Sequence, residues 1–318
     1  MRSWRRCLDA AGVRGKAARA DFVAASRYLR HQELVAWGAL RVLFPPESQP
    51  HTVVASALAR YTDDLCDRGP VAERPRRFDA WAAQVQTALD AGSSEHPLLR
   101  AYVHSAGLLN LSRGWIDVYM AGTRGDLEFA GFAHEADYQR YVDTVTLPSF
   151  MLGAGAVLRV VPDDCFISSA RFAVDGSQRT DFLTDMFEDL EAGRLFLPVG
   201  DLDRYGVTRA DLRKGEDTPA VRALISATAR SARASLLQGE RILGEVAPDY
   251  RPFCRFWIGV QHQRLDEIAR RGTAIIRRPY RDGPVAGARL VVRSRRAGAL
   301  TTALPSHSRP RNPAVRTF

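Results

Sequence analysis

Apolar residues recur every three to four positions along most of the chain, and the alternating pattern of β-strands is almost absent. This spacing predicts amphipathic helices. Proline and glycine lie where such helices should end, as at Phe44-Pro45-Pro46, Gly69-Pro70 and Pro252. The chain is therefore expected to be all-α. The predicted helices span 17–30, 32–43, 50–67, 73–91, 97–107, 111–122, 135–160, 165–193, 217–245 and 250–270.

The pattern of segments predicts one large domain. No internal repeat or linker interrupts residues 17–280, so a single helical domain is expected over 17–285. Residues 1–16 are expected to be a flexible N-terminus, and 286–318 an Arg/Pro/Ser-rich disordered tail. No stretch approaches the roughly 20 apolar residues that span a bilayer, and the N-terminus lacks the apolar part of a signal peptide. A cytoplasmic protein is expected, with peripheral membrane contact left open.

The charge of the chain does not indicate a nucleic-acid-binding protein. The net charge is +9, but arginine dominates mainly after Arg277, and Lys16 and Lys214 are the only lysines. No basic motif interleaved with aromatic residues is present, so no nucleic-acid partner is expected. The four cysteines form no CxxC or Cys/His metal spacing, which favours reduced thiols.

Two pairs of aspartates share the same helical spacing. Asp63 and Asp67 lie four positions apart in ALARYTDDLCDRG, and Asp185 and Asp189 repeat that spacing in TDFLTDMFEDLEAG. Such residues project from one face of a helix, where like charges repel each other. Asp181 extends the second face by one further turn. A divalent cation would remove the repulsion, and Mg²⁺ prefers oxygen ligands completed by substrate phosphates.

The two aspartate pairs are therefore predicted to hold Mg²⁺ between facing helices and to bind a diphosphate. Guanidinium groups suit phosphate oxygens, and Arg60, Arg194 and Arg278 are candidate diphosphate ligands. Metals placed there would stabilise a diphosphate as its carbon–oxygen bond breaks. The alternative is a non-catalytic helical scaffold on which both acidic faces are simply solvated.

These residues together resemble the squalene/phytoene synthase family over about residues 20–285. ARYTDDLCD is similar to that family's first aspartate-rich motif with its preceding arginine. QRTDFLTDMFEDLEAGRLFLP resembles the second, of the form Q-x-T-N-x-x-x-D-x-x-E-D-x-x-x-G-R-x-Y-L-P. Asp126 resembles an acidic residue in the middle of that family's sequences. Tyr141 resembles the tyrosine that begins the family's Y-x-x-x-V-A-G helix. The positions that match the second motif are Gln178, Thr180, Asp185, Glu188, Asp189, Gly193, Arg194, Leu197 and Pro198.

The resemblance implies a class I isoprenoid synthase helical bundle with a central cavity, a Mg²⁺ cluster and an allylic prenyl diphosphate donor. It implies catalytic roles for the four aspartates and Tyr141, and a substrate-binding role for Gln178. Aromatic faces can stabilise a carbocation. The candidate wall residues of the cavity are Phe150, Phe182, Phe187 and Trp257.

Several positions depart from the family pattern, and most concern the second substrate. Asp181 replaces an asparagine, and Thr146-Leu147 replace a small Ala-Gly pair. Pro148 follows, where it is expected to kink the helix. Ser56 stands where a tyrosine is frequent, and Gln261 replaces an aromatic residue.

These departures leave the aspartates and arginines that would ionise the donor unchanged. They alter residues expected around the second substrate, the acceptor. The favoured hypothesis is therefore transfer of a prenyl group to a small apolar or aromatic acceptor of the carbazole or indole kind, in specialised metabolism. Released pyrophosphate or Asp181 would take the aromatic proton. Head-to-head condensation of two prenyl diphosphates, as in squalene and phytoene synthases, and cyclisation of one diphosphate to a terpene remain open as alternatives.

Overall fold

The computed structural model describes residues 3–158, 162–281, 290–291 and 293–294, and their regular secondary structure is entirely helical. The first half contains α1 (Trp4–Ala10), α2 (Lys16–Gln32), α3 (Leu34–Leu43), α4 (Gln49–Asp67), α5 (Arg74–Ala91), α6 (Pro97–Leu109), α7 (Arg113–Asp126), α8 (Glu135–Tyr141) and α9 (Leu147–Leu158). The second half contains α10 (Asp164–Thr184), α11 (Met186–Glu191), α12 (Val199–Tyr205), α13 (Arg209–Lys214), α14 (Pro219–Gly239), α15 (Ile242–Glu245) and α16 (Arg251–Arg271).

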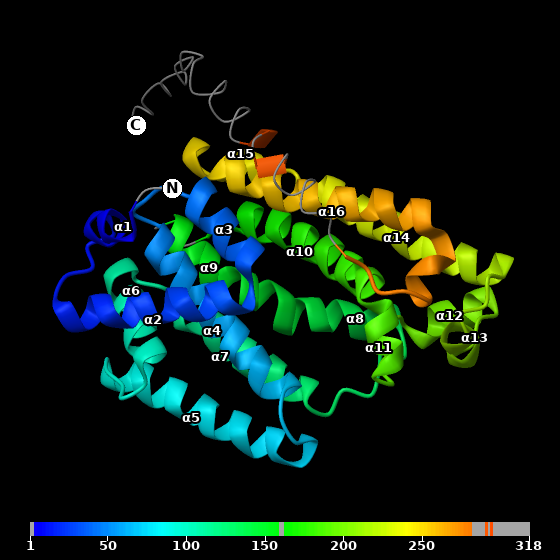
Figure 1. The fold of residues 1–318 in the computed structure, drawn as a ribbon, viewed down its shortest axis with the longest axis horizontal. Coiled ribbons are helices and arrows are strands. Elements are labelled where there is room, and N and C mark those ends of the chain that lie inside the picture. The colour runs from blue at the N-terminus through cyan, green and yellow to red at the C-terminus, as the bar shows by residue number, and fades with distance from the viewer. Residues whose placement is uncertain (1–2, 159–161, 282–289, 292, 295–318) are drawn as a thin grey trace, which may run out of the picture.

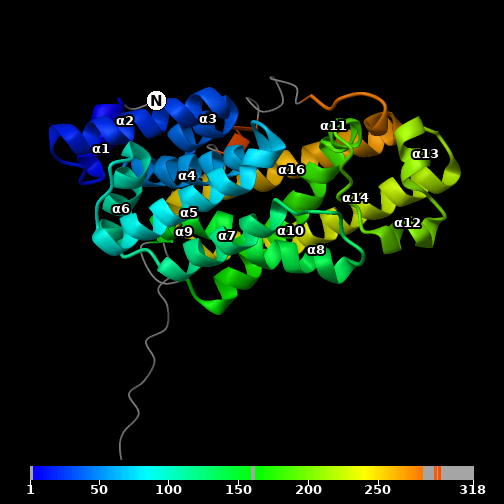
Figure 2. The same cartoon turned by 90° about the horizontal axis from the view of Figure 1, so that it is seen from below.

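The helices form an elongated bundle with α1 and α2 at one end and α12 and α13 at the other (Figures 1 and 2). In the N-terminal half, α4 packs against α2, α6 and α9. In the C-terminal half, α10 packs along α14 and α16. Apolar clusters fill both halves, and a third cluster joins them around Phe132, Tyr138 and Met151. This arrangement confirms the predicted all-α bundle.

The N-terminus differs from the flexible segment expected over residues 1–16. Residues 4–10 form α1, and Cys7 and Leu8 are buried. The Cys7 thiol donates to the amide oxygen of Gln49, and the buried Arg41 guanidinium donates to both side chains. These polar contacts come from helices that are distant in sequence, so the local pattern of residues 1–16 did not reveal them.

The predicted helix 135–160 is interrupted by one π-helical turn, Val142–Thr146, between α8 and α9. Pro148 lacks an N–H group, and its ring conflicts with the carbonyl four positions earlier, which is that of Thr144. The wider π turn accommodates this proline. A Cβ atom at Gly122 of α7 would lie 2.1 Å from the Thr144 carbonyl oxygen. A glycine at this position therefore lets α7 approach the turn.

The predicted helix 165–193 also divides, at Asp185, into α10 and α11. The Thr184 hydroxyl donates to the Asp181 carbonyl oxygen and to the Asp185 carboxylate, so side chains compete with the regular helix here. The backbone N–H groups of Asp185 and Asp189 still donate to the carbonyl oxygens four positions earlier, so the helical spacing of Asp181, Asp185 and Asp189 continues through the break.

The tail expected from residue 286 is described only at 290–291 and 293–294, and the rest of that prediction lies outside the described residues. Leu290 is buried against Ala39, Leu43 and Phe256. At least this part of the segment packs on the bundle. None of the helices in the described part of the chain combines the length and the hydropathy that a membrane-spanning helix needs.

Candidate functional site

The first aspartate pair occupies the last two turns of α4. Asp63 is partly buried and accepts a hydrogen bond of 2.8 Å from the Tyr119 hydroxyl of α7. Burial raises the pKa of Asp63 to about 6. Asp67, one turn later, exposes 55% of its side chain. The pair thus consists of one enclosed and one accessible carboxylate on the same face of the helix.

The intervening Asp64 pairs with other side chains than the aspartate pair does. Its carboxylate pairs with Arg60, accepts a hydrogen bond from Tyr28 and lies 3.2 Å from Arg68. Arg60 was predicted to contact a diphosphate. Its guanidinium is positioned by Asp64, and it lines the same cavity as Asp63.

The second aspartate pair lies at the junction of α10 and α11. Asp185 is exposed at the break between the helices, and Asp189 is buried in α11. The Arg194 guanidinium donates to Asp189 over 3.0 Å and lies 3.7 Å from Asp67. This arginine therefore connects the two motifs. Burial raises the pKa of Asp189, and the carboxylates of Asp185 and Asp67 add to that shift.

Asp126, at the end of α7, extends the same acidic region. Burial raises its pKa to about 7, and the nearby carboxylates of Asp63 and Asp67 contribute. The Tyr141 hydroxyl opposes this shift through a hydrogen bond. The sequence signal for Asp126 was its family resemblance alone, and it was not among the predicted catalytic residues. The structure places Tyr141 beside it.

The donor atoms of this region fit a hard cation. Within the described residues, no three His, Cys, Asp or Glu side chains already form a metal-binding cluster. Mg²⁺, however, is commonly held by one or two carboxylates, with waters and substrate phosphates completing its octahedron. Burial raises the pKa of Asp63, Asp126 and Asp189, and neighbouring carboxylates add to each shift; a divalent cation would offset that negative charge. Asp63, Asp67, Asp185 and Asp189 are the residues that would hold it.

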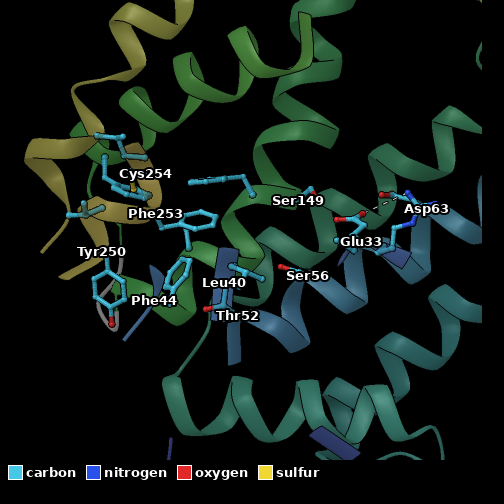
Figure 3. Close-up of a pocket in the computed structure, with 18 residues that line it drawn as sticks. Glu33, Leu40, Phe44, Thr52, Ser56, Asp63, Ser149, Tyr250, Phe253 and Cys254 are labelled. Atoms are coloured by element: carbon cyan, nitrogen blue, oxygen red, sulfur yellow. Dashed lines mark ion pairs between the residues drawn. The ribbon is translucent and has the colours of Figure 1, made fainter. Parts of the chain in front are cut away.

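An apolar cavity of about 280 Å³ opens beside the first motif. Figure 3 shows it running from Asp63 and Glu33 past Ser56 and Ser149 to the aromatic rings at its far end. The far end is formed by α3, α4, α15 and α16, which converge there. Its aromatic and sulfur-containing lining consists of Phe44, Phe150, Phe166, Tyr250, Phe253 and Cys254.

The predicted wall residues separate into two groups. Phe150 lines the cavity and stacks on Trp257, with ring centroids 5.1 Å apart. Phe182 does not line it. Its ring stacks on Phe196 at 4.6 Å, beside Asp189 and Arg194. Phe187 is partly buried in α11 and does not line the cavity.

The other predicted substrate-binding residues differ in their burial and in whether they line the cavity. Gln178 accepts a hydrogen bond from Thr146, so one departure from the family pattern contacts it directly. Gln261 is buried in α16 but does not line the cavity. Arg278 is exposed just after the 3-10 turn Gly272–Ile276. Ser56 lines the cavity, where a larger side chain would reduce the available space.

Asp181 fits poorly as the proposed base for the aromatic proton. Its carboxylate accepts a hydrogen bond of 2.7 Å from Arg264 of α16, and it does not line the cavity. Glu33 was not singled out from the sequence, where it fell inside the predicted helix 32–43 and belonged to no recognisable motif; in the structure it lies between α2 and α3. The structure places its side chain in the cavity wall.

The comparison with known sequences agrees with this architecture. Residues 39–295 match the family model described as squalene/phytoene synthase. The bifunctional protein CrtB/UppS of Streptomyces coelicolor is 27% identical over 258 residues, which cover 81% of this chain and 45% of the relative. This chain therefore spans less than half of that protein. A phytoene synthase of Arthrospira platensis is 29% identical over 224 residues, covering 66% of this chain and 72% of the relative.

Solved structures share the fold at lower sequence identity. Squalene synthase HpnC from Alicyclobacillus acidocaldarius gives a TM-score of 0.75 at 23% identity, covering 85% of this chain and 100% of that one. A dehydrosqualene synthase gives 0.79 at 16% identity, covering 90% and 98%. Because the family model matches most of the chain and both aspartate motifs meet in the bundle, the chain belongs to the squalene/phytoene synthase family, whose members are prenyltransferases.

Proposed function

We propose that this chain is a Mg²⁺-dependent prenyltransferase that ionises an allylic prenyl diphosphate and transfers the prenyl group to a small aromatic acceptor. The observation that carries the proposal is the position of the cavity. Asp63 and Arg60 lie at its charged end with Glu33 next to them, and the rest is apolar apart from a few hydroxyl groups. A diphosphate at the motifs would thus place its prenyl carbon at the mouth of an apolar chamber.

The residues of this chain have separable roles in that reaction. Mg²⁺, when bound by the four aspartates, would neutralise charge on the departing diphosphate. Arg60 and Arg194 add guanidinium donors at the same place. The rings of Phe44, Phe150 and Phe253 exclude water and present π faces to the allylic cation.

The size of the cavity supports a small acceptor. At about 280 Å³ it is slightly smaller than most ligand pockets, which span roughly 300–1,000 Å³. Two long prenyl chains would need more space than one short chain and a flat aromatic ring. Thr146 contacts Gln178, and Ser149 and Phe150 line the cavity, so the Thr146–Phe150 segment shapes the acceptor side.

The second candidate is condensation of two prenyl diphosphates. It is favoured by the similar proteins, which include a phytoene synthase and a dehydrosqualene synthase. The two candidates make different demands on the cavity, because condensation requires a second diphosphate and a second long chain.

Product analysis decides between them. The protein would be incubated with Mg²⁺ and either dimethylallyl or geranyl diphosphate, together with a panel of indoles and carbazoles. We expect a prenylated aromatic product. Parallel reactions with farnesyl or geranylgeranyl diphosphate alone provide the opposing test. A squalene- or phytoene-type hydrocarbon in good yield, with no aromatic product, would establish condensation instead.

A further inference from the structure

Glu33 occupies an unusual place for a glutamate, between α2 and α3 in the wall of the cavity. It is the residue that precedes the first turn of α3, but its side chain makes no capping hydrogen bond there. The carboxylate instead lies between Ser149 and the charged end of the cavity, as Figure 3 shows. The local backbone therefore leaves this side chain available to the cavity.

The carboxylate of Glu33 is incompletely paired. Arg60 approaches it only to 3.9 Å, because the same guanidinium is held by Asp64. Within the described part of the chain, no group donates a hydrogen bond to Glu33. Burial raises the pKa of its carboxyl group, and Arg60 opposes the shift. The Glu33 side chain is 40% exposed, so a ligand that covers this wall would have to replace water at the carboxylate with a hydrogen-bond donor of its own.

The charges of the lining restrict what that ligand can be. The cavity is lined by two carboxylates, Glu33 and Asp63, and by one guanidinium, Arg60. A second diphosphate at this wall would meet a carboxylate rather than a free cation. A neutral molecule with an N–H or O–H group would instead satisfy the carboxylate and fill the apolar space.

We infer that Glu33 binds the acceptor by accepting a hydrogen bond from its ring N–H or phenolic O–H. This inference rests on the proposed function and specifies the acceptor class. In the reaction, the donor C1–O bond breaks and its electron pair leaves with the diphosphate. A π electron pair of the aromatic ring forms the new bond to C1. The ring then loses its C–H proton to the released diphosphate, while Glu33 stabilises the positive charge at the N–H or O–H group.

The test compares indole and carbazole with their N-methyl analogues, which retain the ring but lose the donor. Binding to the protein would be measured by calorimetry, and kcat/KM with geranyl diphosphate and Mg²⁺ would be measured separately. The N-methyl compounds should bind about 10- to 100-fold more weakly to the unmodified protein, as expected for a hydrogen bond to a charged group. The substitution Glu33→Gln keeps an oxygen that can accept the hydrogen bond but removes its charge, so the preference should fall to a few-fold at most.

Glu73→Gln is the matched control. Glu73 also precedes a helix without capping it, but its side chain is exposed and lies outside the cavity lining. It should leave the preference unchanged.

Each outcome separates the two hypotheses. Aromatic prenylation without any preference for N–H compounds would overturn the role of Glu33 and leave the proposed function intact. Glu33-dependent binding of N–H compounds without a prenylated product would support the role of Glu33 and overturn the proposed function. Hydrocarbon formation together with no N–H preference in binding would overturn both.

Discussion

The guanidinium of Arg194 lies 3.7 Å from the carboxylate of Asp67, a residue of a helix far earlier in the chain. Arg194 also donates a hydrogen bond to Asp189, so its guanidinium lies between the two aspartate motifs, which therefore face each other. The motifs lie on α4 and at α11, and the sequence of neither motif shows that these two helices are neighbours. This contact is therefore the tertiary feature that turns two separate spacings into one site.

Removing the Asp63 carboxylate should abolish the ionisation step. The substitution Asp63→Asn keeps the side-chain size and can still pair with Tyr119, but it removes one charged oxygen ligand. Release of diphosphate from geranyl diphosphate with Mg²⁺ should fall about 100-fold or more. Asp79→Asn, on the surface beside Arg124, is the control and should retain normal release. Unchanged release in Asp63→Asn would exclude this carboxylate from the metal site.

Substitution of Arg194 should affect stability in a way that depends on ligand. Arg194→Gln leaves the buried Asp189 without its ionic partner, which should cost about 1–3 kcal/mol in the free energy of unfolding. Urea denaturation would measure this loss without metal and again with Mg²⁺ and pyrophosphate. The loss should grow in their presence, since the variant also lacks a guanidinium donor to the diphosphate and therefore gains less stability from binding it. An equal loss under both conditions would show that Arg194 acts independently of the metal site.

The metal-free protein should become less stable as the pH rises from about 4 to about 7. The pKa of Asp126 is raised to about 7 in the folded chain by burial, whereas an unfolded aspartate titrates near its ordinary value. Over this interval the folded state binds the extra proton, so rising pH favours unfolding. Asp126→Asn should flatten the dependence, measured by thermal unfolding with a chelator present. A steeper dependence in the variant would contradict this assignment.

Gly122 should be intolerant of a methyl group. In Gly122→Ala the added Cβ would lie 2.1 Å from the backbone carbonyl oxygen of Thr144, which has little freedom to move. We expect a loss of about 1–3 kcal/mol in the free energy of unfolding, as for other overpacked sites. Gly107→Ala is a sharp control, because nothing lies within 4 Å of its Cβ position in α6. It should stabilise the protein by about 0.5–1 kcal/mol. Equal effects at the two positions would exclude steric contact as the cause.

The sequence alone determined the helical class, most helix boundaries and the two aspartate motifs. These properties depend on residues close together in the chain, because helical hydrogen bonds join positions four apart. The family resemblance also came from contiguous motifs, and the family match over residues 39–295 confirmed it.

Tertiary structure alone decided which distant side chains share the site. The break at Asp185, the pairing of Asp181 with Arg264 and the packing of α1 depend on contacts between separate helices. Glu33 had no local signal, since its position in the cavity follows from the angle between α2 and α3 and from the approach of α4. Helical periodicity specifies which face of a helix is apolar, but it does not specify which other helix that face meets.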